Sequence, residues 1–310
     1  MPVETSQPAP IAGHGLIAGS GLTAGLTDEE RAGLPSLSPS RAADFKTCPL
    51  LYRFRTIDRI PEPPTPDQAR GTLVHAVLER LFDLPAERRT QAEAAELVVP
   101  QWDRLRAEEP LLESMFGEDT AAPAEFVDST IELLGGYFAV EDPRRLEPAE
   151  RECLVEAVVD DHLLIRGYID RLDVSPAGDL RVVDYKTGGA PREAFEARAL
   201  FQLKFYALVL WRTRGVVPRS LRLLYLKDAE ACDYAPDVEE LTRFERTLVA
   251  LWRAIDRATR ERDFRPKPSR LCGWCSHQSR CPAFGGTPPP FPEPVPAPSA
   301  ADESLVVVDE

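Results

Sequence analysis

The sequence predicts a mixed α/β fold in which a central sheet is flanked by helices. Long helical patterns come first along the chain, a stretch rich in Val, Ile and Leu with turn signals follows, and a long helix, another strand and a last helix complete it. Elements in this order belong to folds in which helices cover a sheet. With 310 residues, 43% of them hydrophobic, the chain can bury such a core.

Helices are expected before the sheet. Ser38 and Pro39 suit an N-cap and the first helical position, so a short helix should lead to Cys48. The next helix, residues 68–84, carries an apolar stripe at helical spacing, formed by Val74, Val77, Leu78 and Leu81. Helical patterns continue over residues 86–108 and 123–139.

The apolar stretch over residues 153–188 is interrupted by turn signals at 160–161 and 175–179, which predicts three antiparallel strands. The remaining expected elements are a helix over 192–213, a strand over 220–227, a further strand near 231–235 and a helix over 238–262. No internal repeat is present, and no G-x-x-x-x-G-K-[ST] motif points to an ATP-driven motor.

Composition sets the expected boundaries and location. Residues 1–36 and the Pro-rich, acidic tail 285–310 are expected to be disordered, which leaves an ordered domain over 37–284. No secretory signal and no run of 18 apolar residues are found, so a cytoplasmic protein without membrane association is expected. In a reducing cytosol, six cysteines point to metal binding, catalysis or burial rather than disulfides.

The net charge of −14 argues against nonspecific electrostatic adhesion to nucleic acid, although it does not exclude a nucleic-acid substrate. Residues 41–59 interleave basic and aromatic side chains. Such a segment suits either a single-strand stacking surface or an amphipathic helix that packs its aromatic residues inward. Composition favours packing.

One lysine stands out in the segment "VVDYKTG", residues 182–188, because only five of the 37 basic residues are lysine. In a strand, Asp184 and Lys186 share a face about 6.6 Å apart. If the loop 175–179 is symmetric, partners in the hairpin sum to 354, and Asp170 lies across from Asp184. Two opposed carboxylates repel each other unless a divalent cation sits between them. A register slip of one residue would instead send one carboxylate to solvent.

Three further polar residues are candidates by position. His75 lies at the border of its helix's apolar stripe, where an imidazole can bind a metal or play a structural part. Gln202 and Tyr206 lie four residues apart and share a helix face, which also suits residues at the border of a core.

Four strings in order, "GTLVHAVLE" (71–79), "RGYIDRLDV" (166–174), "VVDYKTG" (182–188) and "QLKFY" (202–206), resemble the motifs of the RecB-type branch of the PD-(D/E)xK nuclease superfamily. The resemblance implies a restriction-endonuclease-like fold in which Mg²⁺ or Mn²⁺ is bound by His75, Asp170, Asp184 and the carbonyl of Tyr185. It implies that Lys186 orients or activates the attacking water and stabilises charge on the phosphate. Gln202 and Tyr206 would position the motif and the DNA, and Glu79 is a further candidate carboxylate.

The cysteines form a second pattern: C-x2-C-x5-C at Cys272, Cys275 and Cys281, with Cys48 far upstream. The residues alone favour zinc, held by four thiolates or by three with His277. The pattern resembles iron-sulfur nucleases such as the AddB nuclease domain, and this resemblance implies a 4Fe-4S cluster on these four cysteines that joins the two ends of the domain. Cys153 and Cys232 are expected to be buried thiols.

The resemblance implies a metal-dependent DNA exonuclease that acts on single-stranded or frayed ends in repair or recombination, with a separate helicase as a candidate partner. Two alternatives stay open. One is a catalytically silent DNA-end or partner-binding module, whose expected mark is a broken metal set. The other is a CRISPR-associated nuclease that trims spacers.

Overall fold

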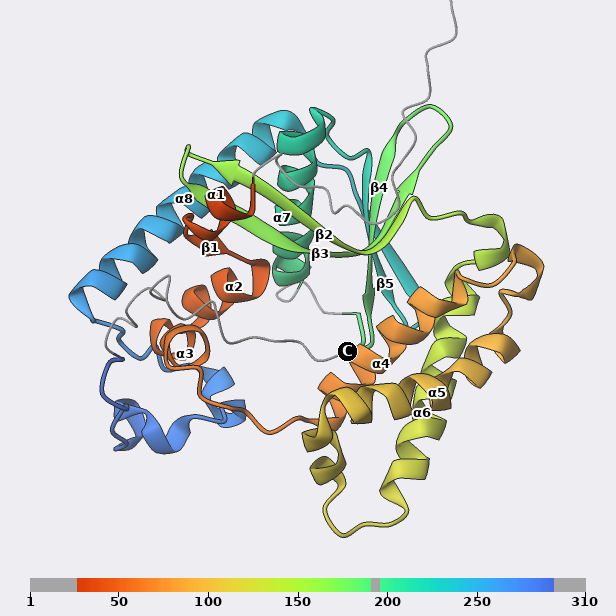
Figure 1. Cartoon of the computed structure of the whole chain (residues 1–310), viewed down its shortest axis with the longest axis horizontal. Coiled ribbons are helices and arrows are strands. Elements are labelled where there is room, and N and C mark those ends of the chain that lie inside the picture. The colour runs from red at the N-terminus through yellow and green to blue at the C-terminus, as the bar shows by residue number, and fades with distance from the viewer. Residues whose placement is uncertain (1–26, 191–195, 293–310) are drawn as a thin grey trace, which may run out of the picture.

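The computed structural model describes residues 27–190 and 196–292 and confirms the predicted mixed α/β architecture (Figure 1). Strand order in the sheet is β1-β3-β4-β5-β6, with β2 also paired to β3. Strands β1 and β3, and β4 and β5, run parallel, whereas the other neighbours are antiparallel. The strands are β1 (Ser36–Leu37), β2 (Glu150–Val159), β3 (Leu163–Val174), β4 (Leu180–Lys186), β5 (Ser220–Tyr225) and β6 (Glu230–Tyr234).

Helices of different lengths cover this sheet. The α-helices are α1 (Asp28–Ala32), α2 (Pro39–Thr47), α3 (Pro49–Tyr52), α4 (Pro66–Leu81), α5 (Gln91–Glu108), α6 (Ala122–Val140), α7 (Glu196–Arg214) and α8 (Val238–Glu261). A π-helical turn, η1, spans Arg53–Ile57. Short 3-10 turns are η2 (Ala86–Arg88), η3 (Pro110–Phe116), η4 (Pro143–Arg145), η5 (Arg270–Trp274), η6 (Gln278–Arg280) and η7 (Pro282–Phe284). No helix in the described ranges is long and apolar enough to cross a membrane.

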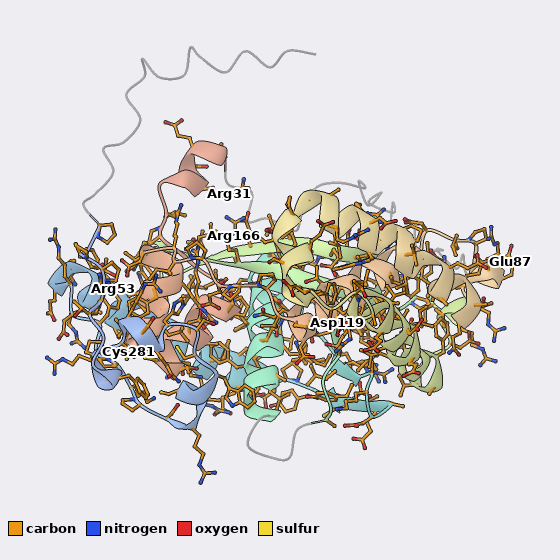
Figure 2. All side chains as sticks on the ribbon, turned by 90° about the horizontal axis from the view of Figure 1, so that it is seen from below. Arg31, Arg53, Glu87, Asp119, Arg166 and Cys281 are labelled. Atoms are coloured by element: carbon orange, nitrogen blue, oxygen red, sulfur yellow. The ribbon has the colours of Figure 1, made fainter. Side chains whose placement is uncertain are left out.

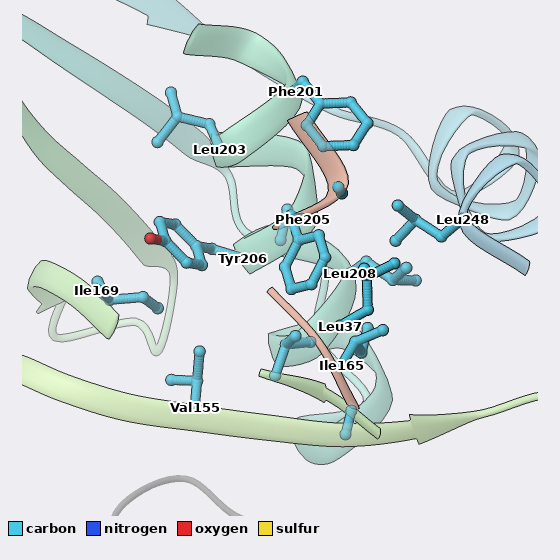
Figure 3. Packing of buried hydrophobic residues seen from close by; sticks show 14 of the residues in the cluster. Leu37, Val155, Ile165, Ile169, Phe201, Leu203, Phe205, Tyr206, Leu208 and Leu248 are labelled. Carbon is cyan, nitrogen blue, oxygen red and sulfur yellow. The ribbon is translucent and has the colours of Figure 1, made fainter. Parts of the chain in front are cut away.

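Strand β4 separates two hydrophobic cores because its side chains alternate between faces. Leu180 and Val182 belong to the core shared with α2, α7 and α8, part of which is shown in Figure 3. Val183 and Tyr185 belong to the core shared with α4, α5 and α6. Strand β4, which carries Asp184 and Lys186, is therefore packed against a hydrophobic core on each face.

The β3–β4 hairpin has the predicted register. Arg171 pairs with Val183 and Leu172 with Val182, so partners sum to 354. The Ser175 side chain accepts a hydrogen bond from the backbone of Asp179 at 3.0 Å and stabilises the turn. Asp170 and Asp184 lie one step beyond the last of these pairs.

Helix starts follow the capping residues. The Ser38 side chain accepts a hydrogen bond from the Arg41 backbone, as expected for the N-cap of α2. Helix α4 begins at Pro66, slightly earlier than expected, because Thr65 and Gln68 form a capping box. The expected start of α7 falls within residues 191–195, which lie outside the described residues.

The expected boundaries of disorder were too wide on both sides. On the N-terminal side, Thr27 and Glu30 form a capping box on α1, Arg31 pairs with the buried Glu156 at 2.9 Å, and Ser36 pairs with strand β3. These backbone and ionic contacts order residues 27–36. The remainder of that segment, residues 1–26, lies outside the described residues.

On the C-terminal side, residues 285–292 pack back onto the domain. The Phe291 ring stacks on Phe264 at a centroid distance of 6.1 Å, and the guanidinium groups of Arg53 and Arg262 lie over it. One aromatic residue thus orders a segment whose proline content suggested disorder. Residues 293–310 lie outside the described part of the chain.

Packing explains the aromatic residues of 41–59, as composition favoured, whereas most of the basic side chains of this segment stay exposed. Tyr52 and Phe54 are buried, and Phe45 packs edge-on against Tyr52. Arg55 forms ion pairs with Asp44 and Glu62, both at 2.7 Å.

Adjacent glycines in α6 give a matched test of this packing. A Cβ at Gly136 would lie 1.8 Å from the carbonyl oxygen of Leu226, which is backbone and cannot rotate away. We expect Gly136→Ala to lower the free energy of unfolding by at least about 2 kcal/mol. Gly135→Ala, which meets only the flexible end of Gln91, should be neutral or raise it by up to about 1 kcal/mol. Chemical denaturation of both variants measures the difference, and equal stabilities would contradict the close approach of α6 to β5.

Candidate active site

Helix α4 meets strands β2, β3 and β4 at one polar group centred on His75. The Nε2 atom of His75 lies 3.0 Å from the carbonyl oxygen of Tyr185. Its Nδ1 atom lies 3.4 Å from Glu152 Oε1 and 3.5 Å from Asp170 Oδ2. Two residues expected at the site, His75 and Asp170, are therefore in contact, and the expected carbonyl of Tyr185 faces the same imidazole.

Asp170 also ends the hairpin ladder. Its Oδ2 accepts a hydrogen bond from the backbone N–H of Tyr185 at 2.8 Å. Asp184, the neighbour of Tyr185 in β4, is only 1% exposed. The two carboxylates predicted from the hairpin register are thus both buried at the same end of the sheet.

Lys186 lies between two polar partners. Its Nζ atom is 2.6 Å from Asp184 Oδ2 and donates a hydrogen bond to Gln202 Oε1 at 3.0 Å. The Gln202 amide in turn donates to the hydroxyl of Tyr206 at 3.0 Å. The structure therefore joins Lys186, Gln202 and Tyr206 into one chain of hydrogen bonds that ends in the α7 core.

Gly167, in the segment "RGYID", leaves space for the Tyr206 ring at the end of this series of hydrogen bonds. A Cβ at Gly167 would lie 2.8 Å from the Tyr206 ring. Tyr206 itself is buried in the core that Figure 3 shows. A side chain at position 167 would displace the ring that holds Gln202, so the glycine is required by close approach.

Tyr185 fixes the backbone between Asp184 and Lys186. Its hydroxyl accepts a hydrogen bond from the fully buried guanidinium of Arg171 at 2.9 Å. Arg171 is also paired with Glu141 at 2.8 Å. Because its ring packs edge-on against both Tyr137 and His75, Tyr185 aligns the strand with α4 and α6.

The charges of the group are strongly coupled. Burial raises the pKa of Asp170 to about 7, and the negative charge of Asp184 adds to this effect. Burial opposes the charge on His75, but Asp170, Glu152 and Asp184 outweigh it and raise the pKa of His75 to about 9. The carboxylates therefore favour a positive charge in their midst.

Glu152 is the site residue that the motifs did not identify. Its side chain, with His75 and Asp170, offers ligand atoms within 4.8 Å of one another. Its φ of 42° is unusual for a non-glycine residue in a strand, and such strain gathers at functional sites. Pairs in the β2–β3 ladder sum to 322, which sets Glu152 across from Asp170. The turn signal at 160–161 predicts this register, so pairing residue numbers across that turn could have identified Glu152 from the sequence.

This group has the donor atoms that a hard divalent cation takes: carboxylate oxygens, a backbone carbonyl and one imidazole. Neither oxygen of Asp184 accepts a well-formed hydrogen bond from a described residue, although the Lys186 ammonium lies close by. Buried acceptors left in this state fit a cation. Glu79 lines the same groove as His75 and Glu152, but it is paired with Arg80 at 3.2 Å. Glu79 and the expected ligand Asp184 both lie outside the group of His75, Glu152 and Asp170 whose ligand atoms are within 4.8 Å of one another.

The four cysteines of the second pattern line one cavity of about 60 Å³. Backbone N–H groups point at two of the sulfurs: Lys267 at Cys48 Sγ, 3.4 Å, and Ser269 at Cys272 Sγ, 3.3 Å. Four thiols gathered around one cavity are a donor set that suits either zinc or an iron-sulfur cluster.

His277 and the two remaining cysteines have other surroundings. His277 is buried, and its Nε2 atom lies 2.7 Å from Glu62 Oε1, so that nitrogen is already engaged by a carboxylate. Cys153 is buried, as expected. Cys232 is half-buried rather than buried, because it lies on the edge strand β6.

Comparison with known proteins agrees with this geometry. The sequence profile of the PD-(D/E)XK nuclease superfamily matches residues 36–282. The Gene 69 proteins of Mycobacterium phages L5 and D29 are 26% and 25% identical over 291 residues, covering 81% of this chain and 97% and 98% of theirs. A structure from Eubacterium rectale, provisionally described as an exonuclease, superposes with a TM-score of 0.51 at 12% identity, covering 91% of this chain and 99% of that one. That likeness concerns the fold. Since the family profile spans most of its length, the chain belongs to the PD-(D/E)XK nuclease superfamily.

Proposed function

We propose that this nuclease is a metal-dependent DNA exonuclease of the RecB-type branch that hydrolyses phosphodiester bonds at single-stranded or frayed DNA ends in repair and recombination. One observation carries the proposal: the Lys186 ammonium is held between Asp184 and Gln202, beside the His75, Glu152 and Asp170 group. The exonuclease description of the E. rectale structure, which has the same fold, supports the exonuclease assignment. A separate helicase that opens duplex ends would fit this substrate.

In the proposed enzyme, Mg²⁺ or Mn²⁺ is held by His75, Asp170, Asp184 and the carbonyl of Tyr185, with Glu152 as an additional carboxylate. When bound, such an ion polarises the phosphoryl oxygen and lowers the pKa of a water molecule. The protein's own part is to fix the ligands: Tyr185 N–H orients Asp170, and the Tyr185 carbonyl orients His75.

Lys186 orients the attacking water and stabilises the negative charge that develops on the phosphate. Its ammonium cannot swing away, because Asp184 and Gln202 hold it from two sides. Gln202 is itself held by Tyr206, so both residues of the Q-x-x-x-Y element act as positioning residues.

The cysteine cavity would hold a 4Fe-4S cluster on Cys48, Cys272, Cys275 and Cys281, as in the AddB-like pattern. The shared cavity and the two N–H···S contacts support metal binding by these cysteines, and the resemblance of their spacing to the AddB-like pattern is the reason for preferring a cluster to zinc. Bound there, the cluster supplies structural linkage between α2 and the C-terminal segment. It takes no part in the hydrolysis, because the four cysteines lie outside the His75 and Lys186 group.

Asp184→Asn tests the metal site directly. The variant keeps shape and removes the charge of a buried ligand, so cleavage of labelled single-stranded DNA with Mg²⁺ or Mn²⁺ should fall at least about 100-fold, while DNA binding in EDTA stays unchanged. Asp161→Asn, at an exposed turn position with positive φ, is the matched control. Wild-type rates in Asp184→Asn would refute the assignment of the site.

Lys186→Arg separates charge from shape. Arginine keeps the positive charge, but its planar fork is bulkier than the ammonium that fits between Asp184 and Gln202. We expect the single-turnover cleavage rate to fall about 100-fold, with DNA affinity within about twofold of wild type. If the variant retained most of its activity, only the positive charge of Lys186 would matter, and the proposed dependence on the shape of the ammonium would be refuted.

Cys281→Ser tests the cluster independently of the chemistry. Anaerobically purified wild-type protein should contain about four irons with acid-labile sulfide per chain, and the variant should lose them. Because binding energy at such a site is also folding energy, limited proteolysis should cut the variant near residues 37–60 and 264–284. Cys232→Ser, at a half-buried thiol outside the cavity, should keep its iron. One tightly bound zinc and no iron in wild-type protein would replace the cluster by a zinc site.

A further inference from the structure

Trp274 is a large aromatic side chain that the fold leaves in solvent. Its side chain belongs to η5, between Cys272 and Cys275, and the residue is 90% exposed. Leu271 and Phe284, in the same cysteine segment, are 44% and 51% exposed. Tryptophan gains most of its stabilising energy when its ring is covered, so Trp274 contributes little to the stability of the isolated domain.

The backbone that carries Trp274 is firmly fixed. The Ser269 side chain accepts a hydrogen bond from the Leu271 backbone at 3.2 Å, and the Gln278 side chain donates to the carbonyl of Cys272. Cys272 and Cys275, which line the cavity, flank Trp274 in the sequence. A partner that covers this indole would therefore pay little entropy for ordering the loop.

The segment of sequence that carries Trp274 is basic, although the chain as a whole is acidic. Residues 265–284 contain four basic residues and no carboxylate. Arg265 is paired with Asp263, but none of the carboxylates in the described ranges forms an ion pair with Lys267, Arg270 or Arg280. Most arginines elsewhere in the domain are paired, so this segment keeps cations available for an anionic partner.

A chain of contacts links this segment to the candidate active site. The Lys267 ammonium donates to the carbonyl of Lys46 at 3.0 Å, and the Lys46 ammonium lies 4.0 Å from the centroid of the Phe201 ring. Phe201 precedes Gln202, which accepts the hydrogen bond of Lys186. Figure 2 places the cysteine segment, with Cys281 labelled, at the opposite end of the molecule from Glu87.

We propose that the cysteine segment is a docking platform for single-stranded DNA, on which Trp274 stacks against a base while Lys267 and Arg270 contact phosphates. A rigid exposed ring among unpaired cations is the combination that binds single strands without sequence preference. The contacts through Lys46 and Phe201 join this segment to α7, which carries Gln202 beside Lys186. This inference deepens the proposed function and rests on it for the substrate.

The experiment measures binding of fluorescein-labelled oligothymidylate by anisotropy, in EDTA so that nothing is cleaved, with the full-length protein. Trp274→Ala should raise Kd about 5- to 100-fold, whereas Trp274→Phe, which can still stack, should stay within about threefold of wild type. Arg270→Ala should flatten the slope of log Kd against log salt by about 0.7, and Trp274→Ala should leave that slope unchanged. Indole fluorescence of the wild type should be quenched by the oligonucleotide.

Arg246→Ala is the matched control, because Arg246 is exposed on α8 and has no ion pair with the described residues; its Kd should not change. Trp274→Ala should keep the wild-type melting temperature and the wild-type rate on a small diester, thymidine 5′-(p-nitrophenyl) phosphate, which is too short to reach the platform. An unchanged Kd with an unquenched indole would overturn the inference and leave protein contact as the use of this surface.

The two proposals can fail separately. Wild-type protein that binds the oligonucleotide through Trp274 but cleaves no DNA with Mg²⁺ or Mn²⁺ would refute the nuclease function and support the platform. Normal cleavage of long single strands by Trp274→Ala, with wild-type Kd, would refute the platform alone.

Discussion

Two buried carboxylates at the end of one hairpin, Asp170 and Asp184, are the constraint on which the site depends. The burial of Asp170 and the negative charge of Asp184 beside it raise the pKa of Asp170 to about 7. A fold can hold such a pair only if other interactions fix the strands that carry it. Here β4 is packed on both faces, and Arg171 ties Tyr185 to Glu141 behind the site. Cations from His75 and Lys186 offset part of the repulsion, and a bound divalent ion would offset more.

The two ends of the domain are joined by residues outside the candidate active site. Cys48 meets the C-terminal cysteines at one cavity, and His277 meets Glu62 beside it. Phe291, under Arg53 and Arg262, adds a third link. These links close a loop that contains every motif residue of the site, and a cluster bound there would restrict the unfolded chain by closing so long a loop. The residues that would hold the cluster are thus different from those of the candidate active site.

Local patterns predicted most of the fold, and distant contacts account for what was missed. Capping residues and alternation located the helices, the strands and the 354 register, because each depends on neighbours in sequence. Glu152 is part of no motif; the β2–β3 register that sets it across from Asp170 follows from the turn at 160–161, but no pattern encodes its positive φ. Residues 285–292 were misjudged because their order depends on Phe291 contacting Arg53, more than two hundred positions away. The composition of a segment does not determine whether it is ordered, because that depends on its contacts with the rest of the domain.

The same distinction resolves the conflict between an acidic protein and an anionic substrate. A net charge of −14 is a sum over the chain, but a phosphate senses charges within about 10 Å at moderate salt. Most of the arginines are neutralised locally by carboxylates, as Arg55 is by Asp44 and Glu62. Two of the five lysines behave differently. Lys46 and Lys267 contact each other beside Phe201 without a carboxylate partner among the described residues, and Lys186 lies beyond Gln202. The negative total is therefore compatible with an anionic substrate, because local pairing, and not the sum over the chain, decides which cations can contact phosphates.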